Sequence, residues 1–331
     1  VIVSQPLSFT NTDLGEIESG NFNVDTAYKS VGVRITDSTK DAEKQSCSTD
    51  NFSIRPSAFN IDIPTSDVNN GSTSGATILA AGDAFQIGVT ATKGYADVPG
   101  FDETAITPHS GGDAGTLSVG NLTNVDSTTG HVIGTDFTYS EVGNFTIDIG
   151  GFVDDGFTSI DQTDDCIPDS ASIVMVDNKI GCNISNENAS DPFGRFVPHH
   201  FNVAIQEHGA LEEGCAGFSY AGQVIDFDLT PELTISAINQ NGVVTANYVG
   251  DYSKLVSSDI IIENIDYDAT QLDADNKVAK VQVDFSGSPS LTSNNDGTFD
   301  WVLDAQVLYE KNVLDVVAPF TADIDIVISE I

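Results

Sequence analysis

Short runs of alternating apolar and polar residues recur along almost the whole chain. In the segment 145–149, for example, Phe145, Ile147 and Ile149 alternate with polar residues. A period of two is typical of a β-strand with one buried face. Clusters of Asn, Asp, Ser and Gly separate the runs, as expected of turns between strands. The pattern therefore predicts an all-β protein, and no segment has a convincing helical period.

The runs fall into two regular halves. We predict tandem immunoglobulin-like β-sandwich domains over 47–155 and 196–331, because short strands with frequent turns are typical of that architecture. Residues 1–46 are predicted to form short strands and a linker, either the tail of an upstream domain or docking strands. The polar segment 156–195 is predicted to be a cysteine-bearing connector. The predicted strands are 1–3, 22–24, 31–35, 52–54, 59–63, 85–89, 115–119, 137–139, 145–149, 171–176, 201–205, 223–229, 233–239, 260–265, 278–285, 297–308 and 324–328, with a type I′ turn at Asn241-Gly242.

Charge narrows the classes of partner. The chain has 331 residues, with 50 Asp and Glu against 12 Lys and Arg, and a formal net charge of −38. Nucleic acid is excluded as a partner because its phosphates would be repelled. Anionic membrane surfaces are disfavoured for the same reason. No apolar run approaches the ~20 residues of a membrane helix, so we expect no membrane insertion of this segment.

Four cysteines indicate an oxidising compartment. Their number is even and they lack zinc spacing, so two disulfides are predicted in preference to free thiols. Sequence alone does not choose among the three possible connectivities. Proximity favours a bond between Cys166 and Cys182, and Cys47 and Cys215 are then left for each other by elimination.

Several acidic loops are candidate calcium sites. Asp154 and Asp155 lie in one such loop, and Asp273 and Asp275 in another. Calcium prefers six to eight convergent oxygen ligands, which such loops can supply. None of them matches the EF-hand pattern. The alternative is solvated turns, because Asp and Asn favour turns without any metal.

We identify no catalytic constellation. The chain has neither a Gly-x-Ser-x-Gly motif nor a phosphate-binding loop, and pairs of carboxylates can be drawn anywhere in so acidic a chain. His199 and His200 are adjacent at a strand entry, where their rings are expected on opposite faces, unsuited to joint metal binding. The sequence therefore predicts a protein without enzymatic activity, catalytic residues or a required cofactor.

A basic and aromatic segment, 193–201, lies where the two halves meet. We predict that it is a packing junction, with Phe196 and Phe201 buried and Arg195 bound to carbonyls or carboxylates. Arg55 is expected to play the same structural role at the start of the first half. The alternative for both arginines is an anionic ligand, which their fork of donors would also suit.

Five motifs in one order support a family resemblance. They are Cys47–Pro56, Tyr139–Thr146, Gly194–Phe201, Cys215–Tyr220 and Val317–Phe320. Their order resembles the conserved C-terminal region of the MshQ-like proteins, named for a component of the mannose-sensitive haemagglutinin pilus locus. The resemblance covers about 47–331 and implies an exported, β-rich bacterial surface protein linked to pilus or filament systems. It transfers no catalytic or binding residue.

The first functional hypothesis is a pilus- or filament-associated structural subunit, located outside the cell or on its outer surface. Its partners would be further copies of itself or other surface and pilus proteins. Assembly would use strand pairing near a chain end, at 324–328 or 1–3, unless those segments pair within their own domain. The alternative hypothesis is an adhesin-type module that binds glycan or another surface ligand, with or without calcium. A concave aromatic patch flanked by acids would favour this alternative.

Overall fold

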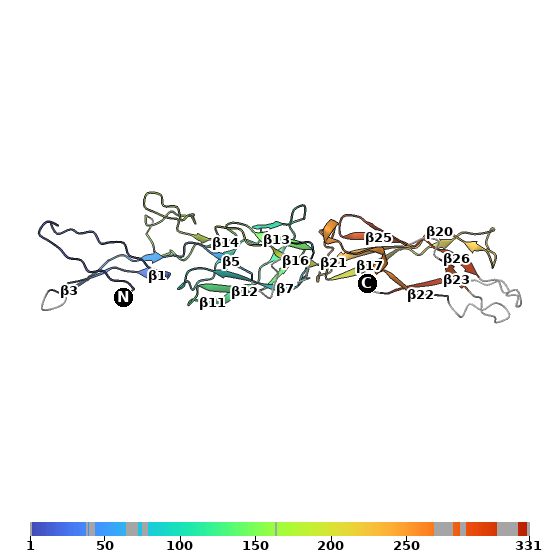
Figure 1. Ribbon diagram of the computed structural model, residues 1–331, viewed down its shortest axis with the longest axis horizontal. Helices are drawn as coiled ribbons and strands as arrows, with labels where there is room; N and C mark the ends of the chain where they lie inside the picture. Colours follow the sequence, from blue (N-terminus) through green and yellow to red (C-terminus); the bar gives the residue numbers. More distant parts are fainter. Residues whose placement is uncertain are drawn as a thin grey trace. The chain divides into compact units, whose positions relative to one another are not determined.

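The computed structural model is nearly all β (Figure 1). It describes residues 2–37, 39, 44–63, 72–74, 79–162, 164–267, 281–284, 289–309 and 324–329. Within these ranges the only helical elements are two 3-10 turns, η1 (Gly250–Tyr252) and η2 (Ser257–Asp259). A search of the same ranges finds no helix with the length and apolar character needed to cross a membrane. The chain divides into two compact units, each described by itself: 1–79 with 83–196, and 80–82 with 197–331.

The described residues of the first unit form five sheets. The largest has the order β10-β12-β7-β5, with β11 also paired to β12, and a second has the order β6-β16-β13-β9. The order β15-β14-β8 forms a third sheet, while β1 pairs with β4 and β2 with β3. The strands are β1 (Tyr28–Val31), β2 (Arg34–Asp37), β3 (Lys44–Cys47), β4 (Phe52–Ile54), β5 (Asn60–Asp62), β6 (Leu79–Ala80), β7 (Ala84–Thr90), β8 (Gly100–Phe101), β9 (Ile106–Pro108), β10 (Leu117–Ser118), β11 (Asn121–Asp126), β12 (His131–Tyr139), β13 (Gly143–Ile147), β14 (Phe152–Asp154), β15 (Ile184–Ser185) and β16 (Phe193–Val197).

Alternation along β7 and β12 produces the core face of the largest sheet. Phe85, Ile87 and Val89 on β7 are buried, and Phe137 is buried opposite Phe85 on β12. The register shifts between Gly134 and Phe137, so that Phe137 remains on the buried face after this irregularity. A Cβ at Gly134 would lie 2.4 Å from the Phe137 ring, and only glycine allows this close approach.

The second unit is built around the order β17-β21-β25-β24. Further sheets have the order β19-β26-β23, β18-β20 and β22-β27. The strands are β17 (His200–Glu207), β18 (Ala210–Leu211), β19 (Val224–Ile225), β20 (Phe227–Leu229), β21 (Glu232–Ile238), β22 (Ile261–Tyr267), β23 (Val281–Asp284), β24 (Ser290–Ser293), β25 (Thr298–Val302), β26 (Gln306–Tyr309) and β27 (Ile324–Ser329). Leu233, Ile235, Phe299 and Trp301 are buried on β21 and β25.

Most predicted strands in both halves are present, but several local predictions were wrong. Residues 22–24 and 171–176 are not strands, and the described part of 1–3 is not one either. The predicted strand 297–308 is divided into β25 and β26. At Asn241-Gly242 only the glycine has a positive φ, 77°, so this turn is not type I′. The C-terminal strand β27 pairs with β22 inside its own chain, which was the alternative to intermolecular pairing at that end.

The units of the structure also place the connector differently. The segment 156–195 was predicted to lie between two domains, but β15 and most of β16 belong to the first unit. Residues 1–46 belong to that unit as well. The immunoglobulin-like topology within each unit remains a prediction.

Candidate interaction surfaces

The aromatic residues of the 193–201 segment lie on both sides of the division between the units. Phe193 and Phe196 on β16 are fully buried in the first unit, and Arg195 between them is also buried. Phe201 belongs to β17 of the second unit and is only half-buried, so its predicted burial was wrong. Its ring lies 5.6 Å from that of Tyr248, at the margin of the second core.

Phe196 joins an aromatic cluster that links two sheets of the first unit. Its ring centroid lies 5.4 Å from Phe85 on β7, 5.2 Å from Tyr139 on β12 and 6.1 Å from Phe145 on β13. Phe193 stacks on Phe145 at 5.3 Å. Aromatic pairs at these separations stabilise a core beyond the apolar area that they bury. Phe193 and Phe196 are therefore core residues of this unit.

The disulfide between Cys166 and Cys182 is present, as predicted, and closes a loop with a sequence separation of 16. The second predicted pair is not formed, because Cys47 and Cys215 are free and exposed. Cys47 ends β3 in the first unit, whereas Cys215 lies in a turn of the second. Elimination failed here because an even number of cysteines does not require each of them to be paired.

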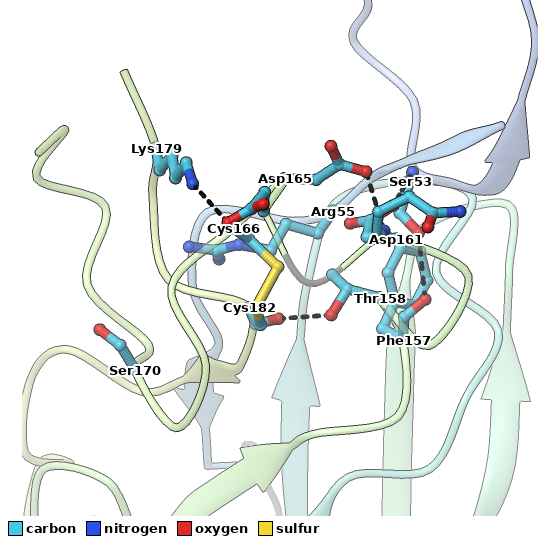
Figure 2. The surroundings of a disulfide bond; sticks show 12 residues. Ser53, Arg55, Phe157, Thr158, Asp161, Asp165, Cys166, Ser170, Lys179 and Cys182 are labelled. Atoms are coloured by element: carbon cyan, nitrogen blue, oxygen red, sulfur yellow. Dashed lines mark hydrogen bonds and ion pairs between the residues drawn. A yellow bond between two sulfur atoms is a disulfide. The ribbon is translucent and has the colours of Figure 1, made fainter. Parts of the chain in front are cut away.

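A pocket of about 500 Å³ lies beside this disulfide, wholly within the first unit. Figure 2 shows two hydrogen bonds beside the disulfide: the Ser53 amide donates to Asp161 at 2.5 Å, and Thr158 Oγ1 donates to the Cys182 carbonyl at 3.0 Å. The lining residues are Asp50, Phe52, Ser53, Ile54, Arg55, Thr158, Asp161, Asp165, Cys166, Ile180 and Gly181. The pocket thus combines one aromatic ring with three carboxylates.

The guanidinium group of Arg55 in this pocket is bound by backbone carbonyls. Arg55 Nη1 donates to the carbonyls of Pro56 at 2.8 Å and Ser57 at 3.2 Å, and Nη2 donates to that of Ser172 at 3.4 Å. Arg55 therefore plays the predicted structural role, tying the residues after β4 to the disulfide loop. Burial raises the pKa of Asp161, and the nearby carboxylates of Asp165 and Asp50 act in the same direction.

The calcium candidate Asp154 is engaged in internal hydrogen bonds. Its Oδ2 accepts from the Tyr95 hydroxyl at 2.7 Å, and its Oδ1 accepts from the amides of Gly156 at 2.8 Å and Phe157 at 3.0 Å. Asp155 is exposed. Asp273 and Asp275 lie outside the described residues. Across the described ranges, no group of three or more His, Cys, Asp or Glu side chains is arranged to hold a metal ion.

We expect Tyr95→Phe to destabilise the first unit by about 1–3 kcal/mol, because the buried Asp154 carboxylate loses a donor. Burial raises the pKa of Tyr95 above its ordinary value of 10.0, and its hydrogen bond to Asp154 adds to this shift. The folded state therefore holds the phenolic proton more tightly than the unfolded chain. The resulting stability is fully present below about pH 10 and is lost as the pH rises beyond it. Urea unfolding between pH 8 and 11 should show a smaller alkaline loss in Tyr95→Phe, whereas equal losses would contradict this assignment.

The first strand of the second unit, β17, is an edge strand that exposes apolar residues. It pairs with β21, and no other described strand pairs with it (Figure 1). Val203 lies opposite Ile235, and Ile205 lies opposite Leu233. Residues directly opposite in an antiparallel pair share one face of the sheet. Ile235 and Leu233 are buried, yet Val203 and Ile205 are 51% and 58% exposed. The core face of this sheet therefore continues onto β17 but is not covered there.

His199 and His200 differ from the prediction of rings on opposite faces. His199 precedes β17 in a bend, and its Nδ1 lies 2.9 Å from that of His200. This distance is a hydrogen bond between the two rings, with one nitrogen donating to the other. Both rings belong to the second unit and provide no third ligand for a metal.

One family model matches part of the chain. Residues 177–330 match the family model of DUF6701, third domain. This is an uncharacterised domain family, so the match carries no activity with it. The match includes strands β17 to β27 of the second unit, and the short 80–82 segment of that unit lies outside it. It begins at the tip of the disulfide loop, in what is structurally the first unit. No curated protein and no solved structure matches the chain significantly.

Proposed function

We propose that this protein is a non-enzymatic structural subunit of a bacterial surface or extracellular assembly, and that its copies associate through β-strand contacts. The observation that carries the proposal is the uncovered core face of β17, where Val203 and Ile205 are exposed in line with buried residues of β21. Open edge strands with apolar side chains are templates for pairing with another chain.

Charge supports the choice of this surface. Edge strands of monomeric proteins are commonly protected by charged residues or proline. Residues 200–206 contain no Asp, Glu, Lys, Arg or Pro, although the chain carries 50 acidic residues. Copies with a net charge of −38 repel one another over most of their surfaces, so a surface without acids is where they can approach.

Two further observations support an extracellular location and a surface role. The disulfide between Cys166 and Cys182 is of the kind that persists in oxidising compartments. The order of the five sequence motifs resembles that of MshQ-like pilus-locus proteins. The tandem immunoglobulin-like arrangement belongs to the same proposal, since such domains are common in extended surface proteins.

We expect Ile205→Asp to weaken self-association by at least about tenfold. The substitution removes an apolar contact worth roughly 1.5–3 kcal/mol and adds a charge that an acidic partner repels. Sedimentation velocity over a concentration series, at low salt and at higher salt that screens the repulsion, measures the change. Val243→Asp is the matched control, because Val243 is 59% exposed and also lies in the second unit. A wild-type chain that stays monomeric at every salt concentration would overturn the proposal.

The alternative function is an adhesin that binds glycan at the pocket beside the disulfide. Phe52 is exposed there, and Asp50, Asp161 and Asp165 provide acceptors for hydroxyl groups. A glycan panel distinguishes the two functions: binding that is lost in Phe52→Ala, together with a monomeric protein, would favour the adhesin.

A further inference from the structure

Residues 2–9 have the properties of an additional strand that lacks a sheet. They lie before the first strand, β1, and Figure 1 draws them without a strand arrow. Within the described part of the chain, their backbone amides and carbonyls make no hydrogen bonds. Ile2, Val3, Leu7 and Phe9 are all exposed, and Phe9 reaches 60%. Pairing with a sheet edge would remove these apolar side chains from water, and the backbone groups of the segment are free to bond to such an edge.

The side chains of this segment are ordered correctly for one face of a sheet. In an extended conformation Val3, Leu7 and Phe9 lie on one face together with Gln5, because successive side chains alternate. Ser4 and Ser8 then lie on the opposite face with Ile2. The apolar face would continue the core face formed by Val203 and Ile205 on β17.

Pro6 is compatible with a strand added at an edge. Alternate residues of a strand direct their backbone groups toward the same neighbour. When Val3, Leu7 and Phe9 direct theirs toward β17, Pro6 directs its missing N–H toward solvent. Proline is tolerated on an outermost strand for this reason.

Charge again favours this pairing. Residues 1–12 contain no charged side chain, and the first acid in the chain is Asp13. Both this segment and residues 200–206 are thus uncharged regions of a protein with a net charge of −38. Contact between them brings no carboxylates together, whereas most other pairings of two copies would.

We propose that residues 2–9 of one copy add as a strand to the open edge of β17 in a second copy. The inference rests on the proposed strand-mediated assembly and assigns the two surfaces that meet in it. The donor segment belongs to the first unit, and the acceptor edge belongs to the second. Such an interface is heterologous, since each copy uses different surfaces to give and to receive. A heterologous interface closes into a ring or continues as an open filament.

The experiment uses full-length single variants, first alone and then mixed. Phe9→Asp inactivates the donor and Ile205→Asp inactivates the acceptor, so each variant alone should associate at least about tenfold more weakly than the wild type. A mixture of the two retains one intact donor and one intact acceptor. We therefore expect the mixture to form 1:1 heterodimers that do not grow further. Hydrogen exchange should show slower exchange at residues 200–207 in those dimers than in either variant alone.

The outcomes separate this inference from the function on which it rests. Leu14→Asp is the control, because Leu14 is 96% exposed in the turn that follows the segment. This variant should associate as the wild type does. If Ile205→Asp weakens association but Phe9→Asp and Leu14→Asp do not, strand-mediated assembly stands and the donor assignment is wrong. If mixing does not produce heterodimers, the heterologous interface is overturned. If the wild type never associates, both proposals are overturned.

Discussion

Replacing Phe196 with alanine is expected to destabilise the first unit by about 3–5 kcal/mol, the range typical of a buried phenylalanine. The Phe196 side chain is fully buried, and it contacts rings on β7, β12 and β13. Its removal leaves a cavity where two sheets meet, and neighbouring aromatic rings are too rigid to fill it completely. Hydrogen exchange of the β13 and β16 amides measures the loss of stability in this unit.

Phe201→Ala is the matched control, because it removes the same side chain five positions later along the chain. Phe201 is half-buried at the margin of the second core, so a loss well below that of Phe196→Ala is expected. The single tryptophan, Trp301, is buried in the second unit, and its fluorescence follows the unfolding of that unit. Equal losses in the two variants would contradict the assignment of Phe196 to the core and Phe201 to its margin.

Removing the disulfide by the double substitution Cys166→Ala and Cys182→Ala should cost about 3 kcal/mol, the chain-entropy value for a loop of this length. Thr158 and Asp161 precede the loop, and their hydrogen bonds with Cys182 and Ser53 connect the lining of the pocket. We therefore expect faster hydrogen exchange across 158–183 as well as a lower midpoint in urea.

The two free cysteines provide the control for this experiment. Cys47→Ser and Cys215→Ser change exposed thiols without cross-links, so each should alter the stability by no more than about 0.5 kcal/mol. Addition of a reductant to the wild type should reproduce the effect of the double substitution. A reductant effect no larger than that of the single substitutions would contradict a stabilising role for the disulfide.

Local pattern was sufficient to predict the all-β class and most of the strands. Alternation in segments such as 85–89 and 233–239 reflects one buried and one exposed face, and that information is contained in the sequence itself. Proximity along the chain also predicted the disulfide between Cys166 and Cys182, because a short loop is easily closed. The pairing of Cys47 with Cys215 could not be judged in this way, since the two residues are far apart in the sequence and belong to different units.

The candidate interaction surface was decided by tertiary structure alone. The sequence predicts a strand at 201–205 and burial of Phe201, but it does not show whether Val203 and Ile205 on the same face are covered. Burial depends on what packs against a strand from elsewhere in the chain, and alternation does not encode it. The fold places β17 at a sheet edge, where Val203 and Ile205 are left uncovered beside the buried Ile235 of β21. The same alternating pattern is therefore core in β21, which has strands on both sides, and surface in β17, which lies at the edge.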